Sequence, residues 1–94
     1  MATIIPYRLN ELHEDGWKIS YGAEVLNGND RFSIERIGSI DNLCEQLAKV
    51  LDGRRQYEVV RTMPQLAEAL HGEVMLATEE EYGQVVKWMG GLVG

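Results

Sequence analysis

Apolar and polar residues alternate strictly over residues 17–25. The apolar positions of this stretch share one parity: Trp17, Ile19, Tyr21, Ala23 and Val25. A period of two in aromatic and β-branched residues predicts a strand with one buried face.

A turn signal follows, because residues 26–30 read Leu-Asn-Gly-Asn-Asp. Asn27-Gly28 supplies the positive φ values that a tight hairpin turn needs. We therefore expect a β-hairpin whose return strand covers residues 31–37. The alternation breaks at Ile37, which predicts a strand end or a β-bulge there.

Parity indicates how the two strands of the hairpin pair. Setting Ala23 opposite Phe32 and Tyr21 opposite Ile34 aligns the apolar faces and needs a two-residue turn. Sliding the pairing by one residue would place Tyr21 opposite Glu35 and spoil both faces. We expect the first register.

An amphipathic helix is predicted after Ser39, which is a good N-cap residue, and Gly53 is a good residue to end it. Its apolar positions follow helical spacing: Ile40, Leu43, Cys44, Leu47, Val50 and Leu51.

A second helix is predicted from residue 78 onward. Thr78-Glu79-Glu80-Glu81 has the pattern of a capping box, and three carboxylates in the first turn complement the helix dipole. We expect residues 90–94 to fray. The predicted buried stripe is Tyr82, Val85, Val86, Met89 and Val93.

Between these helices we expect a strand over residues 57–61 and an interior strand over residues 74–77. A short helix with Pro64 in its first turn and Gly72 at its end should join them. The apolar residues of this helix, at helical spacing, are Met63, Leu66, Ala67 and Leu70. The connection is long enough for a right-handed crossover between parallel strands.

Residues 1–16 allow two interpretations. Ile4, Ile5 and Tyr7 predict a short strand, which Pro6 would confine to a sheet edge. Alternatively, Leu9 and Leu12 lie on one short helix that ends near Gly16.

The elements together predict a single α+β domain over residues 1–94. We expect a small mixed sheet of about four strands, comprising the N-terminal hairpin and the two later strands, with the helices packed on it. Ninety-four residues with a hydrophobic fraction of 45% suit one such globular domain.

The net charge of −6 is unevenly distributed. Residues 1–30 carry −3, residues 31–61 carry +1 and residues 62–94 carry −4. An acidic total disfavours non-specific binding to nucleic acid and suits a basic protein partner. A nucleic-acid edge formed by Arg54, Arg55 and Arg61 is a lesser alternative.

Cys44 is the single cysteine of the chain, so an internal disulfide is excluded and a cytoplasmic location is expected. It lies within the apolar helical stripe, where we expect a buried, unreactive thiol. The longest apolar run is short, and the first residues lack the pattern of a signal peptide, so no membrane association is predicted.

The sequence carries no catalytic, cofactor or metal signature. His13 and His71 lie far apart and Cys44 is in the stripe, so the short-spaced ligand pair of a zinc site is missing. Glu79, Glu80 and Glu81 are explained by the helix start. The sequence therefore favours a protein that is not an enzyme, and leaves an enzyme as the alternative.

Two function classes remain. The first is a small acidic prokaryotic or phage protein that binds a larger, basic protein or nucleoprotein. It would act as an inhibitor, an immunity or anti-defence protein, or an accessory subunit, with Trp17 and Trp88 as anchors and Glu79 and Glu80 as an acidic rim.

The second class is a small enzyme or ligand-binding domain. Its pocket would lie at the carboxyl ends of the parallel strands, near residues 61–64 and 77–80. Helix N-termini meeting there would favour an anion, although the three glutamates would oppose one.

Overall fold

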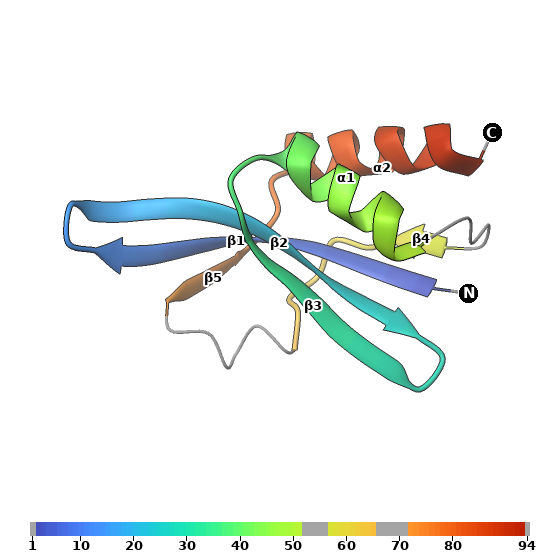
Figure 1. Ribbon diagram of the computed structural model, residues 1–94, viewed down its shortest axis with the longest axis horizontal. Helices are drawn as coiled ribbons and strands as arrows, with labels where there is room; N and C mark the ends of the chain where they lie inside the picture. The colour runs from blue at the N-terminus through green and yellow to red at the C-terminus, as the bar shows by residue number, and fades with distance from the viewer. Residues whose placement is uncertain (1, 52–56, 66–71, 94) are drawn as a thin grey trace.

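A mixed five-stranded sheet carries two helices on one face in the computed structural model, which describes residues 2–51, 57–65 and 72–93 (Figure 1). The predicted α+β class is confirmed. The elements are β1 (Ala2–His13), β2 (Gly16–Asn27), β3 (Asp30–Ile37), α1 (Ile40–Leu51), β4 (Tyr57–Val59), β5 (Glu73–Leu76) and α2 (Glu79–Val93). The strand order is β3-β2-β1-β4, and β5 also pairs with β1.

β1 is the central strand of the sheet. It pairs antiparallel with the whole of β2, and its other side pairs first with β4 and then with β5. The first interpretation of residues 1–16 was therefore right about a strand and wrong about an edge, and the helical interpretation was wrong.

Pro6 is tolerated in the centre of the sheet because of where its nitrogen points. The Ile4 carbonyl accepts a hydrogen bond of 2.9 Å from the Val60 amide, so Ile4 faces β4. Alternate residues of a strand face the same neighbour, so the Pro6 nitrogen faces that side too. β4 pairs with β1 up to Ile4 and β5 pairs from Tyr7 onward, so Pro6 falls in the gap and no ladder bond is lost.

The predicted hairpin is present, but its register was wrong by two residues. Val25 lies opposite Phe32, Ala23 lies opposite Ile34, and the two-residue loop is Gly28-Asn29. A slip of two residues keeps every side chain on its own face, so the hydrophobic pattern cannot distinguish the two registers.

A β-bulge near the end of β3 confirms the predicted irregularity at Ile37. Between the pairs Ala23–Ile34 and Tyr21–Ile37, β3 has one residue more than β2. Arg36 takes a φ of 56° within this bulge, and β3 ends at Ile37.

The main core lies between the sheet and the two helices. α1 starts after Ser39, whose Oγ accepts a hydrogen bond of 3.1 Å from the Asn42 amide. Its predicted stripe is buried except for Val50, which is 39% exposed; Gly53 lies outside the described residues. The core residues are Ala2, Ile4, Ala23, Val25, Ile40, Leu43, Cys44, Leu47, Leu51, Val85 and Met89.

α2 begins with the predicted capping box. The Glu81 amide donates to Thr78 Oγ1 over 3.1 Å, and the Thr78 amide donates to Glu81 Oε1 over 2.9 Å. Val85 and Met89 of the predicted stripe are buried, whereas Val86 is 41% exposed.

α2 continues through Gly90 and Gly91 to Val93, and the fraying of residues 90–94 stays a prediction. Glycine weakens a helix without forbidding helical dihedral angles, so Gly90-Gly91 does not end it. Gly94 and the side chain of Val93 lie outside the described residues.

The expected parallel pair over residues 57–61 and 74–77 is wrong. β4 is parallel to β1, whereas β5 is antiparallel to β1, and both lie along the same side of β1. Residues 62–65 are not helical, and the rest of the expected short helix lies outside the described residues. Val74, Met75 and Leu76 are half-buried, so β5 is not an interior strand.

The sheet face opposite the helices has a smaller core of Tyr7, Leu9 and Val74. Glu24 lies on the same face and is fully buried. It accepts a hydrogen bond of 2.6 Å from the Gln65 amide and pairs with Arg31 Nε at 3.3 Å. This carboxylate therefore fastens the segment after β4 to the sheet, and its charge is neutralised by Arg31.

Candidate functional site

The β1–β2 hairpin carries an exposed apolar stripe at its end. Leu12, Trp17 and Ile19 are 67%, 62% and 45% exposed. Leu12 and Trp17 are direct cross-strand partners, and Ile19 is two residues further along β2 on the same face. We call these three residues the hairpin stripe.

The hairpin stripe continues the face that forms the main core. Trp17 and Ile19 have the parity of Ala23 and Val25, which are 0% and 1% exposed under the helices. β1 and β2 reach beyond the ends of both helices, so in the described part of the chain this end of the face has no cover (Figure 1). The stripe is thus core-like surface left open to solvent.

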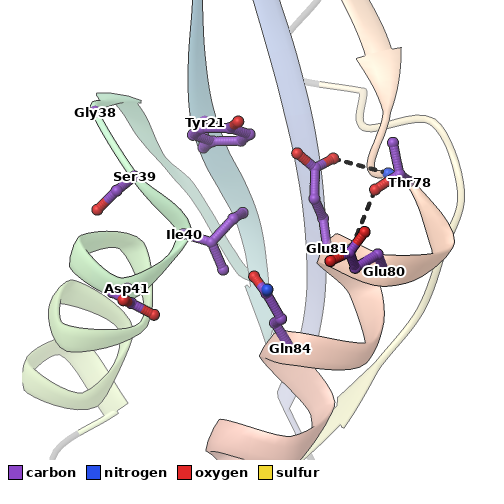
Figure 2. A pocket seen from close by; sticks show the side chains of 9 residues that line it. All are labelled: Tyr21, Gly38, Ser39, Ile40, Asp41, Thr78, Glu80, Glu81 and Gln84. Carbon is purple, nitrogen blue, oxygen red and sulfur yellow. Dashed lines mark hydrogen bonds between the residues drawn. The ribbon is translucent and has the colours of Figure 1, made fainter.

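A cleft of about 420 Å³ lies where the helices begin and the stripe ends (Figure 2). Tyr21, the next residue of this parity after Ile19, stands at the sheet side of the cleft. Its lining residues are Tyr21, Gly38, Ser39, Ile40, Asp41, Thr78, Glu80, Glu81 and Gln84. We call it the helix cleft.

The helix cleft is acidic although two helix N-termini border it. One amide of each first turn is already capped: Ser39 accepts from the Asn42 amide in α1, and Thr78 accepts from the Glu81 amide in α2. Asp41 and Glu80 add two exposed carboxylates. An anion would meet these negative charges, so the cleft favours a cationic group over an anionic one.

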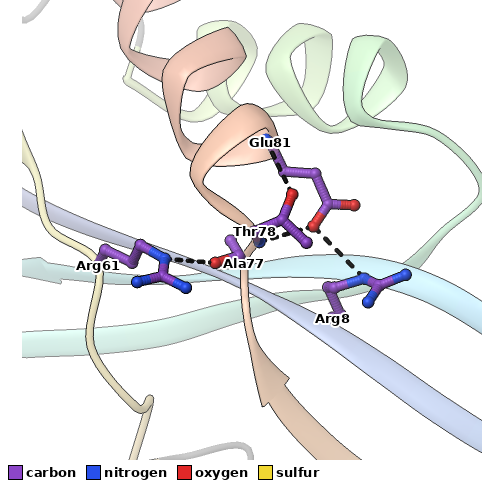
Figure 3. A network of polar contacts seen from close by, with 5 residues as sticks. All are labelled: Arg8, Arg61, Ala77, Thr78 and Glu81. Carbon is purple, nitrogen blue, oxygen red and sulfur yellow. Dashed lines mark hydrogen bonds and ion pairs between the residues drawn. The ribbon is translucent and has the colours of Figure 1, made fainter.

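A polar network fixes the start of α2 against the sheet (Figure 3). Glu81 completes the capping box and also pairs with Arg8 Nε at 3.4 Å. Arg61 Nε donates to the Ala77 carbonyl over 2.6 Å. The first turn of α2, which carries Glu79 and Glu80, is thereby held in one position relative to the hairpin.

Three of the four proposed partner-binding residues are exposed, one on the projecting hairpin and two at the start of α2. Trp17 is in the hairpin stripe, and Glu79 and Glu80 are exposed in the first turn of α2 beside the helix cleft. Tyr21 of the cleft is four residue steps along β2 from Trp17, which is roughly 13 Å.

Trp88 lies apart from this surface. It is half-buried and packs against the main core, and α2 runs away from the hairpin end toward its own C-terminus (Figure 1). Trp88 is ten residue steps after Thr78, which is about 15 Å along the helix. Its assignment as a second anchor stays a prediction.

Leu12 and Ile19 are surface residues that the sequence did not single out. Ile19 was expected on the buried face of its strand, and Leu12 was expected on a possible helix. Neither position has a local signal for exposure, because exposure here depends on how far the helices reach along the sheet.

Cys44 is buried, as predicted, with an exposed fraction of 1%. Burial, reinforced by the nearby Asp41 carboxylate, raises the pKa of its thiol from 9.0 to about 11. A thiol with this pKa is protonated at neutral pH, which opposes a nucleophilic role.

Three other kinds of site were considered: a metal site, a membrane span and a nucleic-acid edge of arginines. They contain no cluster of three histidine, cysteine or carboxylate side chains that would hold a metal ion. Over the same ranges, neither helix has the length and hydrophobicity to span a bilayer. Arg61 is bound to the Ala77 carbonyl, and Arg54 and Arg55 lie outside the described ranges.

The alternative pocket at parallel strand ends loses its structural basis, because the two strands concerned are not a parallel pair. The segments near Arg61 and Ala77 do meet, through the hydrogen bond in Figure 3. That contact ties the two segments together.

Comparisons with protein-family models, with curated proteins and with solved structures found no match to this chain.

Proposed function

We propose that this protein is a binding module that covers a surface of a larger, basic protein partner. It would act as an inhibitor, an immunity or anti-defence protein, or an accessory subunit in the cytoplasm. The observation that carries the proposal is the hairpin stripe, a set of core-like side chains left exposed beside an acidic cleft.

The stripe supplies the apolar part of such an interface. Trp17 and Leu12 lie side by side across the hairpin, and Ile19 extends the patch toward the helices. Tryptophan is enriched among residues that dominate binding energy, and burying this patch removes apolar surface from water. A partner that covers it replaces the missing cover on this end of the sheet.

The charges beside the stripe favour a basic partner. Glu79, Glu80 and Asp41 are exposed near the helix cleft, and the chain carries a net charge of −6. Complementary charge speeds encounter between proteins, whereas a central aromatic residue mainly slows dissociation. The two parts of the surface therefore predict different kinetic effects.

The first test identifies the partner and then measures binding rates. Affinity purification from the native host supplies the partner, and surface plasmon resonance follows association and dissociation. For Trp17→Ala we expect dissociation to be about thirty-fold faster, which corresponds to a loss of about 2 kcal/mol of binding free energy. Val50→Ala, a truncation at an exposed position of α1, is the matched control and should change neither rate.

The second test uses charge. Glu79→Lys combined with Glu80→Lys should slow association and flatten its dependence on salt, while dissociation stays near the parent value. Glu45→Lys with Glu58→Lys changes the net charge equally at exposed positions outside the first turn of α2 and should have a smaller effect.

Two results would refute the proposal. One is parent-like binding by both the Trp17 and the glutamate variants; the other is turnover of a substrate by the protein alone. Generic duplex DNA serves as a further analyte, for which the acidic total predicts no binding at physiological salt. A steep salt-dependent shift with DNA would redirect attention to Arg54, Arg55 and Arg61.

A further inference from the structure

The outer edge of β3 is an unpaired strand edge in the described part of the chain. β3 stands at the end of the strand order, and no described main-chain group bonds to its outer side (Figure 1). Asn27 and Asp30 flank the two-residue loop as a hydrogen-bonded pair, and bonded and non-bonded pairs alternate from there. The amides and carbonyls of Arg31, Ser33 and Glu35 therefore point outward.

We propose that this edge pairs antiparallel with β3 of a second copy of the chain, about a two-fold axis at Ser33. In that register Ser33 lies opposite Ser33 of the second copy, and the outward groups of Arg31 meet those of Glu35. Each main-chain group that faces outward over residues 31–35 then gains a hydrogen-bond partner.

The side chains are self-complementary in this register. Arg31 of each copy lies opposite Glu35 of the other, so two pairs of opposite charge form. Phe32 and Ile34, which are half-buried and border the main core, lie opposite each other and are covered further. A two-fold interface requires such self-complementarity, because the same strand supplies both sides.

Neighbouring registers lack this match. A shift of two residues places Arg31 opposite Ser33, or Ser33 opposite Glu35, and loses the charge pairing. A shift of one residue sets outward groups against inward ones and loses the hydrogen bonds. The charges that normally protect a strand edge are thus arranged to select one antiparallel partner.

The contacts already made by Arg31 are compatible with this pairing. Arg31 reaches Glu24 through Nε and Gln65 through one terminal nitrogen. A guanidinium carries five N–H donors, so donors remain for a further carboxylate beside these two contacts. The bulge at Arg36 ends the flat part of the edge, which limits the pairing to residues 31–35.

Cross-linking of the full chain tests the axis directly. Directly opposite residues of a hydrogen-bonded pair have Cα atoms about 5.5 Å apart, which a disulfide spans. For Ser33→Cys we expect rapid formation of a disulfide-linked dimer under mild oxidation. Lys49→Cys, exposed on α1, is the matched control and should cross-link slowly, and native Cys44 is buried.

Sedimentation velocity of the parent from micromolar to near-millimolar concentration provides the second measurement. We expect a concentration-dependent dimer that Glu35→Arg abolishes, because it sets like charges opposite each other at both ends. Glu45→Arg makes the same charge change at an exposed site on α1 and should still dimerise. Thermal melting confirms that each variant is folded.

Three outcomes would overturn the proposal. They are a parent that stays monomeric throughout, Ser33→Cys cross-linking no faster than Lys49→Cys, and a dimer that survives Glu35→Arg but is lost in Trp17→Ala. The last outcome would assign self-association to the hairpin stripe. The proposal does not depend on the proposed partner, because its edge and the stripe share no residue.

Discussion

Tyr7 lies across Gly22, its direct partner on β2. A Cβ atom on Gly22 would collide with the ring of Tyr7 and stand 2.6 Å from the Ile34 carbonyl oxygen. The ring crosses β2 at this point and its hydroxyl meets Ser33 Oγ at 2.9 Å on β3. One side chain thus connects three neighbouring strands, and it needs a residue without a side chain beneath it.

We predict that Gly22→Ala destabilises the fold by about 1–3 kcal/mol, because the added methyl group overpacks a rigid contact. Chemical denaturation measures the loss. Gly83→Ala in α2 is the matched control, since nothing lies within 4 Å of the added methyl group. The control should gain up to about 1 kcal/mol from helix propensity. Equal midpoints for the two variants would contradict the contact.

The β2–β3 loop requires a glycine at a second position. Gly28 has a φ of 64° at the first loop position, and among described non-glycine residues Arg36 alone has a positive φ, so Asn29 does not. This is the pattern of a type II′ turn. For Gly28→Val we expect a loss of roughly 1–2 kcal/mol, because a β-branched residue resists positive φ.

Gly28→Asn is the control for the loop, since asparagine tolerates positive φ better than valine. It should lose less stability in the same thermal unfolding experiment. If valine and asparagine were equally tolerated, the turn geometry would be incorrect.

The helix start at Thr78 gives a third prediction. Thr78→Ala removes the acceptor of the Glu81 amide and should lower the free energy of unfolding by about 1 kcal/mol. Thr78→Ser keeps the acceptor and should stay close to the parent. A denaturant midpoint for the alanine variant that equals the serine variant would show that the capping box contributes nothing.

Local signals made the helix starts predictable from the sequence. Ser39 and Thr78 cap the helices whose stripes follow them, because a cap acts on amides within three residues. The class of fold and the existence of the hairpin follow from hydrophobic periodicity in the same way.

Features that depend on contacts between distant parts of the chain could not be predicted from the sequence. The hairpin register was missed because a shift of two residues preserves parity. The central position of β1 was missed because Pro6 is tolerated there only in the gap between β4 and β5. The exposure of Leu12 and Ile19 depends on where the helices stop covering the sheet. Trp17 was proposed as an anchor because of its residue type, whereas its neighbours Leu12 and Ile19 were identified only in the structure.

The last prediction concerns Cys44 and pH. Burial raises the pKa of its thiol to about 11 in the folded protein, above the ordinary value of 9.0. The unfolded chain therefore releases the thiol proton at lower pH than the folded protein does. The associated stability is complete below pH 9.0 and is lost as pH rises toward about 11.

Denaturation of the parent and of Cys44→Ala across this range isolates the effect. The alanine variant loses packing at every pH, but its stability should fall less steeply between pH 9.0 and 11. Tyr7, whose pKa burial also raises, contributes to both proteins and cancels in the comparison. A thiol reagent should label the native parent slowly at neutral pH and quickly after unfolding. Parallel stability curves, or rapid labelling of the native protein, would mean that the thiol is accessible and would return Cys44 to consideration as a nucleophile.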